Sequence, residues 1–307
     1  MLLILVATLA ALAAAQSTPW PKFGNWTEEF NGYPYILSGP MTLGKKTDFE
    51  IERCHYVLRL LDERTHAPAR QVPLPTPASR CMDILVQRKS ALGDQAFLEI
   101  FSEDIEDAKR FWYDINFNST LHDPATWKAV ECRALVPLPN VNAWAFSTWS
   151  ASPFADAANN RGNAEHYFKN SSQSGGGAGA AATSRILEGW GGVLTNFSIP
   201  NYSARTCAQR PMVRPLPEFR LKACGDKNLV DDKDTNFGVL QIAARDVNVA
   251  GARYVDIYAS VWYGSGISEE HMEAERQHII IEIVNLSLKA QEDIQSGRFR
   301  VPAPPAS

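Results

Sequence analysis

Side chains that could take part in catalysis alternate with apolar ones along Tyr254–Tyr263, and this pattern is typical of a β-strand. One face of this strand carries Val255, Ile257, Ala259 and Val261, and the other carries Tyr254, Asp256, Tyr258, Ser260 and Trp262. A carboxylate among aromatic rings and phenols suits an apolar ligand cavity with a few placed polar groups. Burial among such rings would raise the pKa of Asp256 and suit it to proton transfer.

This face gives a first hypothesis for a catalytic site. Asp256 moves a proton, while the phenols of Tyr254 and Tyr258 stabilise a developing oxyanion. Trp262 stacks on the substrate. Trp190, placed at a tight turn among three glycines, is a further candidate for substrate binding. The alternative is that the strand face is an ordinary solvated or inter-sheet surface without chemistry.

His166 is a second candidate acid or base. It lies just before a segment rich in Gly, Ala and Ser, so it could belong to a mobile lid over a site. A lone histidine on the protein surface is the alternative interpretation.

Another polar pattern follows one face of the helix that is expected near the C-terminus. His271, Glu275, His278 and Glu282 recur there at helical spacing, and histidines interleaved with glutamates suggest a metal site. The face continues to Asn285, which begins the sequon Asn-Leu-Ser, and a glycosylated asparagine must lie outside. The HExxH order that places a base beside zinc is absent. We therefore predict a solvated helix face and no metal site.

Signatures of several other reaction classes are absent. The chain has no GxSxG elbow, no phosphate-binding loop and no dinucleotide fingerprint, so no cofactor is expected. Paired carboxylates for glycoside hydrolysis need only the right spatial separation, which a sequence neither supplies nor excludes.

The helix that carries the polar pattern is well marked. Ser268 is a good N-cap, Glu269 and Glu270 suit the positive end of the helix dipole, and Gly297 is a natural stop. An apolar stripe with helical spacing runs through Met272, Ile279, Ile283, Leu286, Ala290 and Ile294. A helix is therefore expected over Ser268–Ser296.

Strands are expected to form most of the remaining chain. In the first half they are predicted at Phe49–Leu60, Cys81–Gln87, Gln95–Phe101, Trp127–Val136 and Val141–Trp149. In the second half they are predicted at Val193–Ile199, Phe219–Ala223, Phe237–Asp246 and Tyr254–Tyr263. Residues 16–169 are thus expected to be a β-rich part, and residues 185–307 to hold strands and the helix of the same domain. Residues 170–184 are too poor in apolar side chains to form a core, and are a flexible loop or a linker.

Several features predict export. Residues 1–15 form a short apolar run that ends in an Ala-x-Ala pattern, as in a secretory signal peptide. Six sequons predict a glycoprotein: Asn25, Asn118, Asn170, Asn196, Asn201 and Asn285. Five cysteines suggest two disulfides and one leftover thiol, and Cys207 with Cys224 is the first pair expected.

Charge and hydropathy exclude some partners. The formal net charge is −4, so the chain lacks the basic balance that tracks a phosphate backbone, and no nucleic-acid partner is expected. No later stretch approaches the length of a membrane span.

Four segments carry a resemblance. Residues 165–170, 188–202, 214–219 and 275–299 together resemble a group of secreted proteins from filamentous fungi that has no assigned activity. The resemblance covers about the last half of the chain. It implies extracellular routing and a fungal source, with a place in secondary metabolism as one setting, and it implies no reaction.

The sequence therefore predicts an α+β fold in which a curved, mostly antiparallel β-sheet encloses an apolar cavity and packs on a long C-terminal helix. In outline this is similar to helix-grip folds, although shape does not fix function. Two functions are carried forward. One is a secreted, cofactor-independent isomerase, lyase or cyclase that acts on a small apolar metabolite. The other is a secreted binder of a hydrophobic ligand without catalysis.

Overall fold

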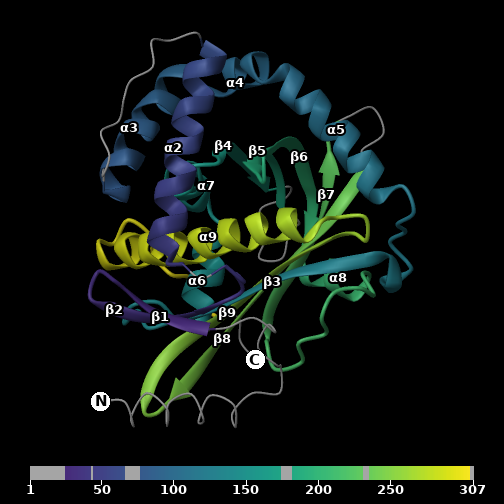
Figure 1. Ribbon diagram of the computed structural model, residues 1–307. Coiled ribbons are helices and arrows are strands. Elements are labelled where there is room, and N and C mark those ends of the chain that lie inside the picture. Colours follow the sequence, from purple (N-terminus) through teal and green to yellow (C-terminus); the bar gives the residue numbers. More distant parts are fainter. Residues whose placement is uncertain (1–24, 43, 66–76, 174–181, 231–234, 305–307) are drawn as a thin grey trace.

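The computed structural model describes residues 25–42, 44–65, 77–173, 182–230 and 235–304 (Figure 1). Its strands are β1 (Asn25–Phe30), β2 (Tyr33–Ser38), β3 (Trp127–Val136), β4 (His166–Gln173), β5 (Ala182–Trp190), β6 (Val193–Tyr202), β7 (Leu221–Leu229), β8 (Asn236–Val249) and β9 (Ala252–Gly264). Its helices are α2 (Lys46–Thr65), α3 (Ala78–Leu92), α4 (Asp94–Ile100), α5 (Ser102–Asn116), α6 (Ala143–Ser150), α7 (Pro153–Gly162), α8 (Ala204–Ala208) and α9 (Glu269–Gln295), with a 3₁₀ turn at Pro124–Thr126.

The strands form a single nine-stranded sheet in the order β1-β2-β3-β9-β8-β7-β6-β5-β4. All neighbouring strands pair antiparallel. The sheet curves around α9, which runs across its concave face (Figure 1). The prediction of an α+β fold with a curved antiparallel sheet and a long C-terminal helix is confirmed.

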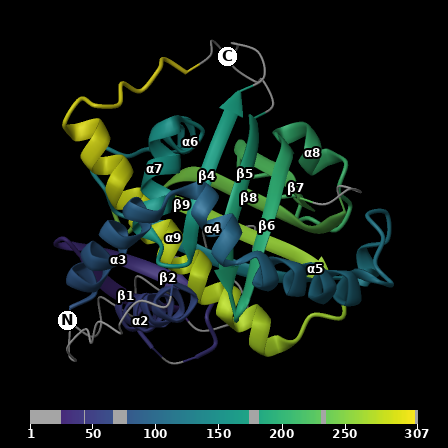
Figure 2. The same ribbon diagram turned by 90° about the horizontal axis from the view of Figure 1, so that it is seen from above.

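Helix α9 is held at its start by a cap and along its length by apolar packing. The side chain of Ser268 accepts a hydrogen bond from the His271 backbone N–H at 3.2 Å, as the sequence predicted. Ile280 and Val284 are fully buried in the main core, which also holds the inward side chains of β9. Helices α2, α3, α4 and α5 form an arch on the side of α9 away from the central strands (Figure 1). From above, β4, β5 and β6 lie across α9 (Figure 2).

The prediction of a β-rich first half is wrong. The segments expected to be strands at Phe49–Leu60, Cys81–Gln87, Gln95–Phe101 and Val141–Trp149 lie in helices α2, α3, α4 and α6. In α2 the fully buried residues Cys54, Val57 and Leu61 recur at spacings of three and four, which is the period of one helix face. Helices α2 and α3 pack together and share a small core. Of the strands predicted before residue 150, only Trp127–Val136 is a strand, β3.

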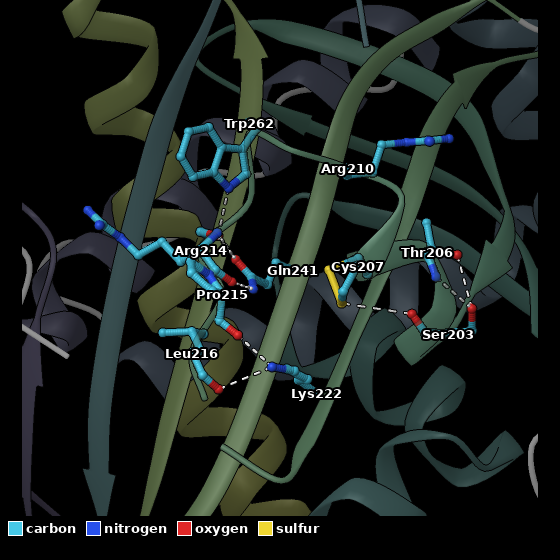
Figure 3. The surroundings of a disulfide bond; sticks show 12 residues. Ser203, Thr206, Cys207, Arg210, Arg214, Pro215, Leu216, Lys222, Gln241 and Trp262 are labelled. Atoms are coloured by element: carbon cyan, nitrogen blue, oxygen red, sulfur yellow. Dashed lines mark hydrogen bonds between the residues drawn. A yellow bond between two sulfur atoms is a disulfide. The ribbon is translucent and has the colours of Figure 1, made fainter. Parts of the chain in front are cut away.

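Two disulfides join Cys54 to Cys81 and Cys207 to Cys224. Cys132 is a free, buried thiol. The predicted pair Cys207–Cys224 is confirmed, and so is the count of two bridges and one thiol. The second bridge ties α8 to β7 beside the outer face of the sheet (Figure 3). Two disulfides favour a non-reducing compartment.

The predictions of export and of a glycine-rich loop or linker can be compared with the structure only in part. Residues 1–15 lie outside the described residues, as do residues 174–181 of the predicted loop or linker. The strands on either side of that segment, β4 and β5, pair with each other, which is expected of a loop within one domain. In the described part of the chain, no helix combines the length and the apolar character that a membrane crossing needs.

Three of the six predicted glycosylation sites are buried or half-buried. Asn196 is buried in β6. The side chain of Asn285 is half-buried: it donates a hydrogen bond to Glu50 at 2.7 Å and accepts one from Lys46 at 2.6 Å. The expectation that the Asn285 sequon lies outside is therefore wrong. Asn25, Asn118 and Asn170 are exposed, and Asn201 is half-buried.

Candidate functional site

Asp256 lies on the outer, convex face of the sheet in a closed ion-pair network. Its Oδ1 accepts a hydrogen bond from Arg133 Nε at 2.7 Å, and its Oδ2 accepts from Arg133 Nη2 at 2.6 Å and from Arg245 Nε at 2.7 Å. Arg133 and Asp256 are both fully buried. Because both carboxylate oxygens are held by guanidinium groups, the predicted role of Asp256 in proton transfer has no support in this geometry.

The other predicted residues of this strand face also lack a shared cavity. The Tyr258 hydroxyl donates to Glu131 Oε1 at 2.6 Å, and its ring packs under Leu216 and Phe219. Trp262 donates to Ser260 Oγ at 3.2 Å. The segment around Arg214 crosses this face and is fixed there by the side-chain amide of Gln241 (Figure 3).

Tyr254 packs in a separate small cluster with Leu135 and Val249 at the far end of β9. The predicted aromatic cavity around Asp256 is thus contradicted by the packing. Asp256 and Tyr258 are covered by other residues, and Tyr254 and Trp262 pack in two separate clusters. Two pockets formed by the described residues have none of Tyr254, Asp256, Tyr258 and Trp262 in their lining.

A different set of polar side chains meets on the concave face, between the sheet and α9. We call His166, Glu188, His278 and Glu282 the His/Glu cluster. His166 and Glu188 lie opposite each other on the paired strands β4 and β5. His278 and Glu282 are four residues apart on α9, so both point toward the same strands.

The tips of these four side chains converge. His166 Nε2 is 2.9 Å from Glu188 Oε2, 2.9 Å from Glu282 Oε1 and 3.1 Å from His278 Nε2. The four ligand atoms all lie within 4.8 Å of one another. His166 and His278 are buried, whereas the Glu282 side chain keeps 25% of its exposure.

The predicted solvated face of α9 is therefore wrong. His271, Glu275 and His278 are all buried beneath the sheet and the helical arch. Because this face is buried, its expected exposure to solvent no longer excludes a metal site. The interpretation of His166 as a surface histidine is wrong as well, because its side chain is 2% exposed.

Lys227, from β7, places a positive charge against the cluster. Its Nζ donates to Glu188 Oε1 at 3.3 Å and to the Tyr263 hydroxyl at 3.4 Å. It also lies 4.4 Å from the ring centre of Trp190 and 4.5 Å from that of Phe197. The buried ammonium group is thus paired with one carboxylate and held among aromatic rings.

Glu165 completes the surroundings of His278. His278 Nδ1 lies 3.3 Å from Glu165 Oε2, and the side-chain amide nitrogen of Asn163 lies 3.3 Å from His278 Nε2. Glu165 is itself buried and lies 4.0 Å from the guanidinium group of Arg53. These contacts fix the orientation of the His278 ring.

Buried charges in the cluster shift one another's pKa values. Burial would lower the pKa of His278, but the hydrogen bond to Glu165 and the charge of Glu282 outweigh it and raise the pKa to about 9. Burial would also lower the pKa of His166, yet the carboxylates of Glu188 and Glu282 hold it above its ordinary value. For Glu282, burial raises the pKa, but His166 more than offsets this and lowers it.

A pocket of about 230 Å³ opens beside the His/Glu cluster. Its apolar and aromatic lining consists of Tyr56, Leu60, Tyr167, Trp190, Val193 and Leu194. Glu165 lines the same pocket and contacts His278, so this carboxylate links the pocket to the cluster. Arg64 and Asp104 form an ion pair at its edge, at 2.6 Å. Trp190 of this pocket packs against His278 of the cluster, with ring centres 5.9 Å apart, whereas His166 does not line the pocket.

Sequence reasoning missed Glu188 and Glu165 and misjudged His278 and Glu282. One signal was present in the apolar run around them. Ile279, Ile280 and Ile281, with Ile283 and Val284, leave almost no side of the helix free of large apolar residues. A helix of that kind is buried all round, so polar residues within it are buried too.

Comparisons with known proteins give a general likeness of chain trace. No family model matches the sequence, and neither does any curated protein. The aromatase/cyclase Zhui from Streptomyces sp. R1128 is 9% identical, with a TM-score of 0.33, over 58% of this chain and 99% of that one. A norcoclaurine synthase mutant from Thalictrum flavum is 12% identical, with a TM-score of 0.33, over 56% of this chain and 97% of that one. The ginseng major latex-like protein 151 from Panax ginseng is 9% identical, with a TM-score of 0.30, over 57% of this chain and 99% of that one. Such scores carry no conclusion about activity.

Proposed function

We propose that this chain is an exported enzyme that isomerises, cyclises or eliminates a group from a small, largely apolar molecule. The observation that carries the proposal is the pocket lined by apolar side chains and by Trp190, whose ring centre lies 5.9 Å from that of His278 in the buried His/Glu cluster. Apolar walls bind the body of such a molecule, and the charged end orients its polar group. Because the cluster is shielded from water, its charges act more strongly than they would in solvent.

Export is supported by the two disulfides and by the apolar run at residues 1–15. The sequons open to solvent, at Asn25, Asn118 and Asn170, are the proposed positions of glycans. A fungal source and a role in secondary metabolism stay proposals that rest on the resemblance of the second half of the chain.

A substrate search tests the enzymatic proposal. The secreted protein is incubated with a small-molecule extract and the mixture is followed by liquid chromatography with mass spectrometry. We expect one compound to be consumed while an isomer or a dehydrated product appears. Val193→Trp fills the pocket, whereas Val247→Trp adds the same bulk at a half-buried valine of β8 that does not line it.

The two variants decide whether the pocket is the site. Loss of turnover in Val193→Trp with turnover kept in Val247→Trp supports the proposal. Equal turnover in both variants would place the reaction elsewhere. A compound that is retained by the protein and recovered unchanged would overturn the enzymatic proposal and favour a carrier.

A second candidate function, a binder without catalysis, is favoured by one surface feature. Phe117 is 84% exposed at the end of α5, beside a pocket of about 380 Å³ that Tyr113, Leu121 and Trp127 also line. An exposed aromatic group beside a hollow is typical of a surface that binds an apolar ligand. In this case Phe117→Ser would abolish retention of the ligand, and neither the variant nor the wild type would convert it.

A further inference from the structure

We propose that His166, Glu188, His278 and Glu282 together bind one divalent transition-metal ion, with Zn²⁺ as the first candidate. Two imidazoles and two carboxylates are among the ligands that Zn²⁺ takes in proteins. Ligand atoms about 2.0–2.2 Å from a tetrahedral zinc ion are roughly 3.3 Å apart. The distances of 2.9, 2.9 and 3.1 Å from His166 Nε2 to its three neighbours are close to that spacing. Small outward shifts of the side chains would admit the ion.

Hydrogen bonds alone do not explain the approach of these groups. An imidazole nitrogen carries at most one hydrogen, directed outward in the ring plane. His166 Nε2 nevertheless has two carboxylate oxygens and a second imidazole nitrogen within 3.1 Å. One hydrogen cannot serve all three acceptors well. A cation at the centre would be attracted by all four ligand atoms at once.

The charge balance points the same way. Glu165, Glu188, Glu275 and Glu282 bring carboxylates to the surroundings of the two imidazoles. Lys227 pairs with Glu188 at 3.3 Å, and Arg53 lies 4.0 Å from Glu165. Buried charges are stable only when they are paired or coordinate a metal. Without a metal, the proton on His278 supplies further positive charge, since the pKa of that imidazole is raised to about 9; a divalent cation would displace this proton and take over its charge.

The contacts behind His278 are those expected for a metal-binding histidine. A ligating imidazole commonly donates its other N–H to a carboxylate, which fixes the ring and raises its basicity. Glu165 Oε2 lies 3.3 Å from His278 Nδ1, in position to accept that hydrogen. With the hydrogen on Nδ1, the lone pair of Nε2 lies among the other three ligand atoms, and a metal ion would replace the Asn163 amide that approaches it at 3.3 Å.

The choice of metal follows from the ligands. Mg²⁺ and Ca²⁺ prefer shells made only of oxygen atoms, whereas imidazoles suit zinc and its first-row neighbours. Glu282 is the one ligand that solvent reaches, with 25% of its side chain exposed. It is therefore the ligand that a water or substrate oxygen would displace. A metal there would act as the Lewis acid of the proposed reaction; this last step rests on the proposed function, and metal binding itself does not.

Metal binding is tested without any substrate. The wild-type protein is freed of metal by dialysis against a chelator and titrated with Co²⁺, while its visible absorption is recorded. Zn²⁺ is then added as a competitor, and the number of bound metal ions per chain is measured by inductively coupled plasma mass spectrometry. We expect one ion per chain, a visible Co²⁺ spectrum of a four- or five-coordinate site, and a rise in Tm with Zn²⁺.

Two histidines of the same helix give a matched pair of variants. His278→Gln removes a ligand and is expected to weaken Co²⁺ binding on the order of 100-fold or more. His271→Gln removes a buried histidine that contacts Phe111 and Trp112 and is no member of the cluster, so its affinity should equal that of the wild type. Equal affinity in His278→Gln would overturn the proposal.

The wild-type titration stands even if a variant fails to fold. A wild-type protein with no coordination spectrum and no bound metal would overturn the metal site. Turnover by the metal-free protein would overturn the Lewis-acid role of the metal and leave the proposed function. One bound ion with no turnover of any compound would leave the metal site and overturn the proposed function.

Discussion

Asp256 and Arg133 form a two-point ion pair with both side chains fully buried, and its hydrogen bonds are 2.7 and 2.6 Å long. The pair crosses from β9 to β3 at the centre of the sheet. Arg245 on β8 binds the same carboxylate at 2.7 Å. The carboxylate therefore joins three neighbouring strands. This arrangement gives Asp256 a role in stability.

Asp256→Asn should destabilise the protein by about 3–5 kcal/mol, because it leaves buried guanidinium charge without its partner. Chemical denaturation measures the change. Asp107→Asn breaks an exposed ion pair with Arg110 and should change stability by no more than about 0.5 kcal/mol. Turnover per folded molecule should be unchanged in Asp256→Asn. A stable variant with lost turnover would restore the proton-transfer role.

Glu165→Gln should weaken metal binding about 10- to 100-fold, because it removes the carboxylate that accepts from His278. Competitive Co²⁺ titration measures the change. Glu275→Gln is the control: it also removes a buried negative charge, but that carboxylate accepts from the Tyr263 hydroxyl at 2.9 Å and touches no proposed ligand. Equal losses in the two variants would show that charge alone matters and that the hydrogen bond to His278 does not.

Gly191→Ala should cost more stability than Gly192→Ala, although both glycines have positive φ in the β5–β6 turn. A Cβ at Gly191 would lie 2.7 Å from His271 Nδ1, whereas a Cβ at Gly192 would meet nothing within 4 Å. Backbone strain costs roughly 1–2 kcal/mol at either position, and the clash adds roughly 1–3 kcal/mol at Gly191 only. Thermal and chemical unfolding measure both variants. Equal losses would contradict the close packing of this turn on α9.

His271 should make the protein less stable as the pH falls from about 6.5 toward 4. Burial, and then the charge of Lys227, lower the pKa of folded His271 to about 4, against about 6.5 in an unfolded chain. Between these values the unfolded chain binds a proton that the folded chain does not, so acid favours unfolding. The effect is on the order of 3 kcal/mol and is complete near pH 4.

His271→Phe removes this contribution and keeps a ring among Phe111, Trp112 and Trp190. Unfolding free energies are measured from pH 7 to pH 4 with a chelator present, so that metal binding adds nothing. The wild type should lose more stability than the variant over this range. Parallel profiles would contradict the assignment.

Thiol counting should give three distinct values. The native protein should show no reactive thiol, because Cys132 is fully buried and burial holds the pKa of its thiol well above the ordinary value. Denaturation without reductant should expose one thiol, and denaturation with reductant should expose five. A native protein that reacts at once would contradict the burial of Cys132.

The sequence predicted those elements whose apolar residues recur at one regular period. In β9 the alternation is regular, and in α9 the apolar stripe and the Ser268 cap agree with each other. The prediction of a strand at Phe49–Leu60 failed because helix α2 is apolar on two sides. Cys54 packs toward α3, while Tyr56 and Leu60 line the pocket. Apolar residues on both sides of a helix produce a spacing of two, which imitates a strand.

The site was predictable only in pieces. The spacing of His278 and Glu282 showed that they share a helix face. Their meeting with His166 and Glu188 depends on the pairing of β4 with β5 and on where that hairpin crosses α9. One sequence does not contain that information. The inference from the Asn285 sequon to an exposed face also failed, because a sequon marks a glycan only if its asparagine is accessible.

The position of β3 in the sheet bears on how the protein is made. Most of the pairing of β3 is with β9, over a register that runs from Trp127–Gly264 to Val136–Val255. During synthesis β3 is therefore made long before β9. Until β9 follows, the unpaired edge of β3 can form hydrogen bonds with other strands. The sheet is complete only after β9 has been made, and the site only after His278 and Glu282 of α9 have followed, so folding of the sheet and assembly of the site both belong to the end of synthesis.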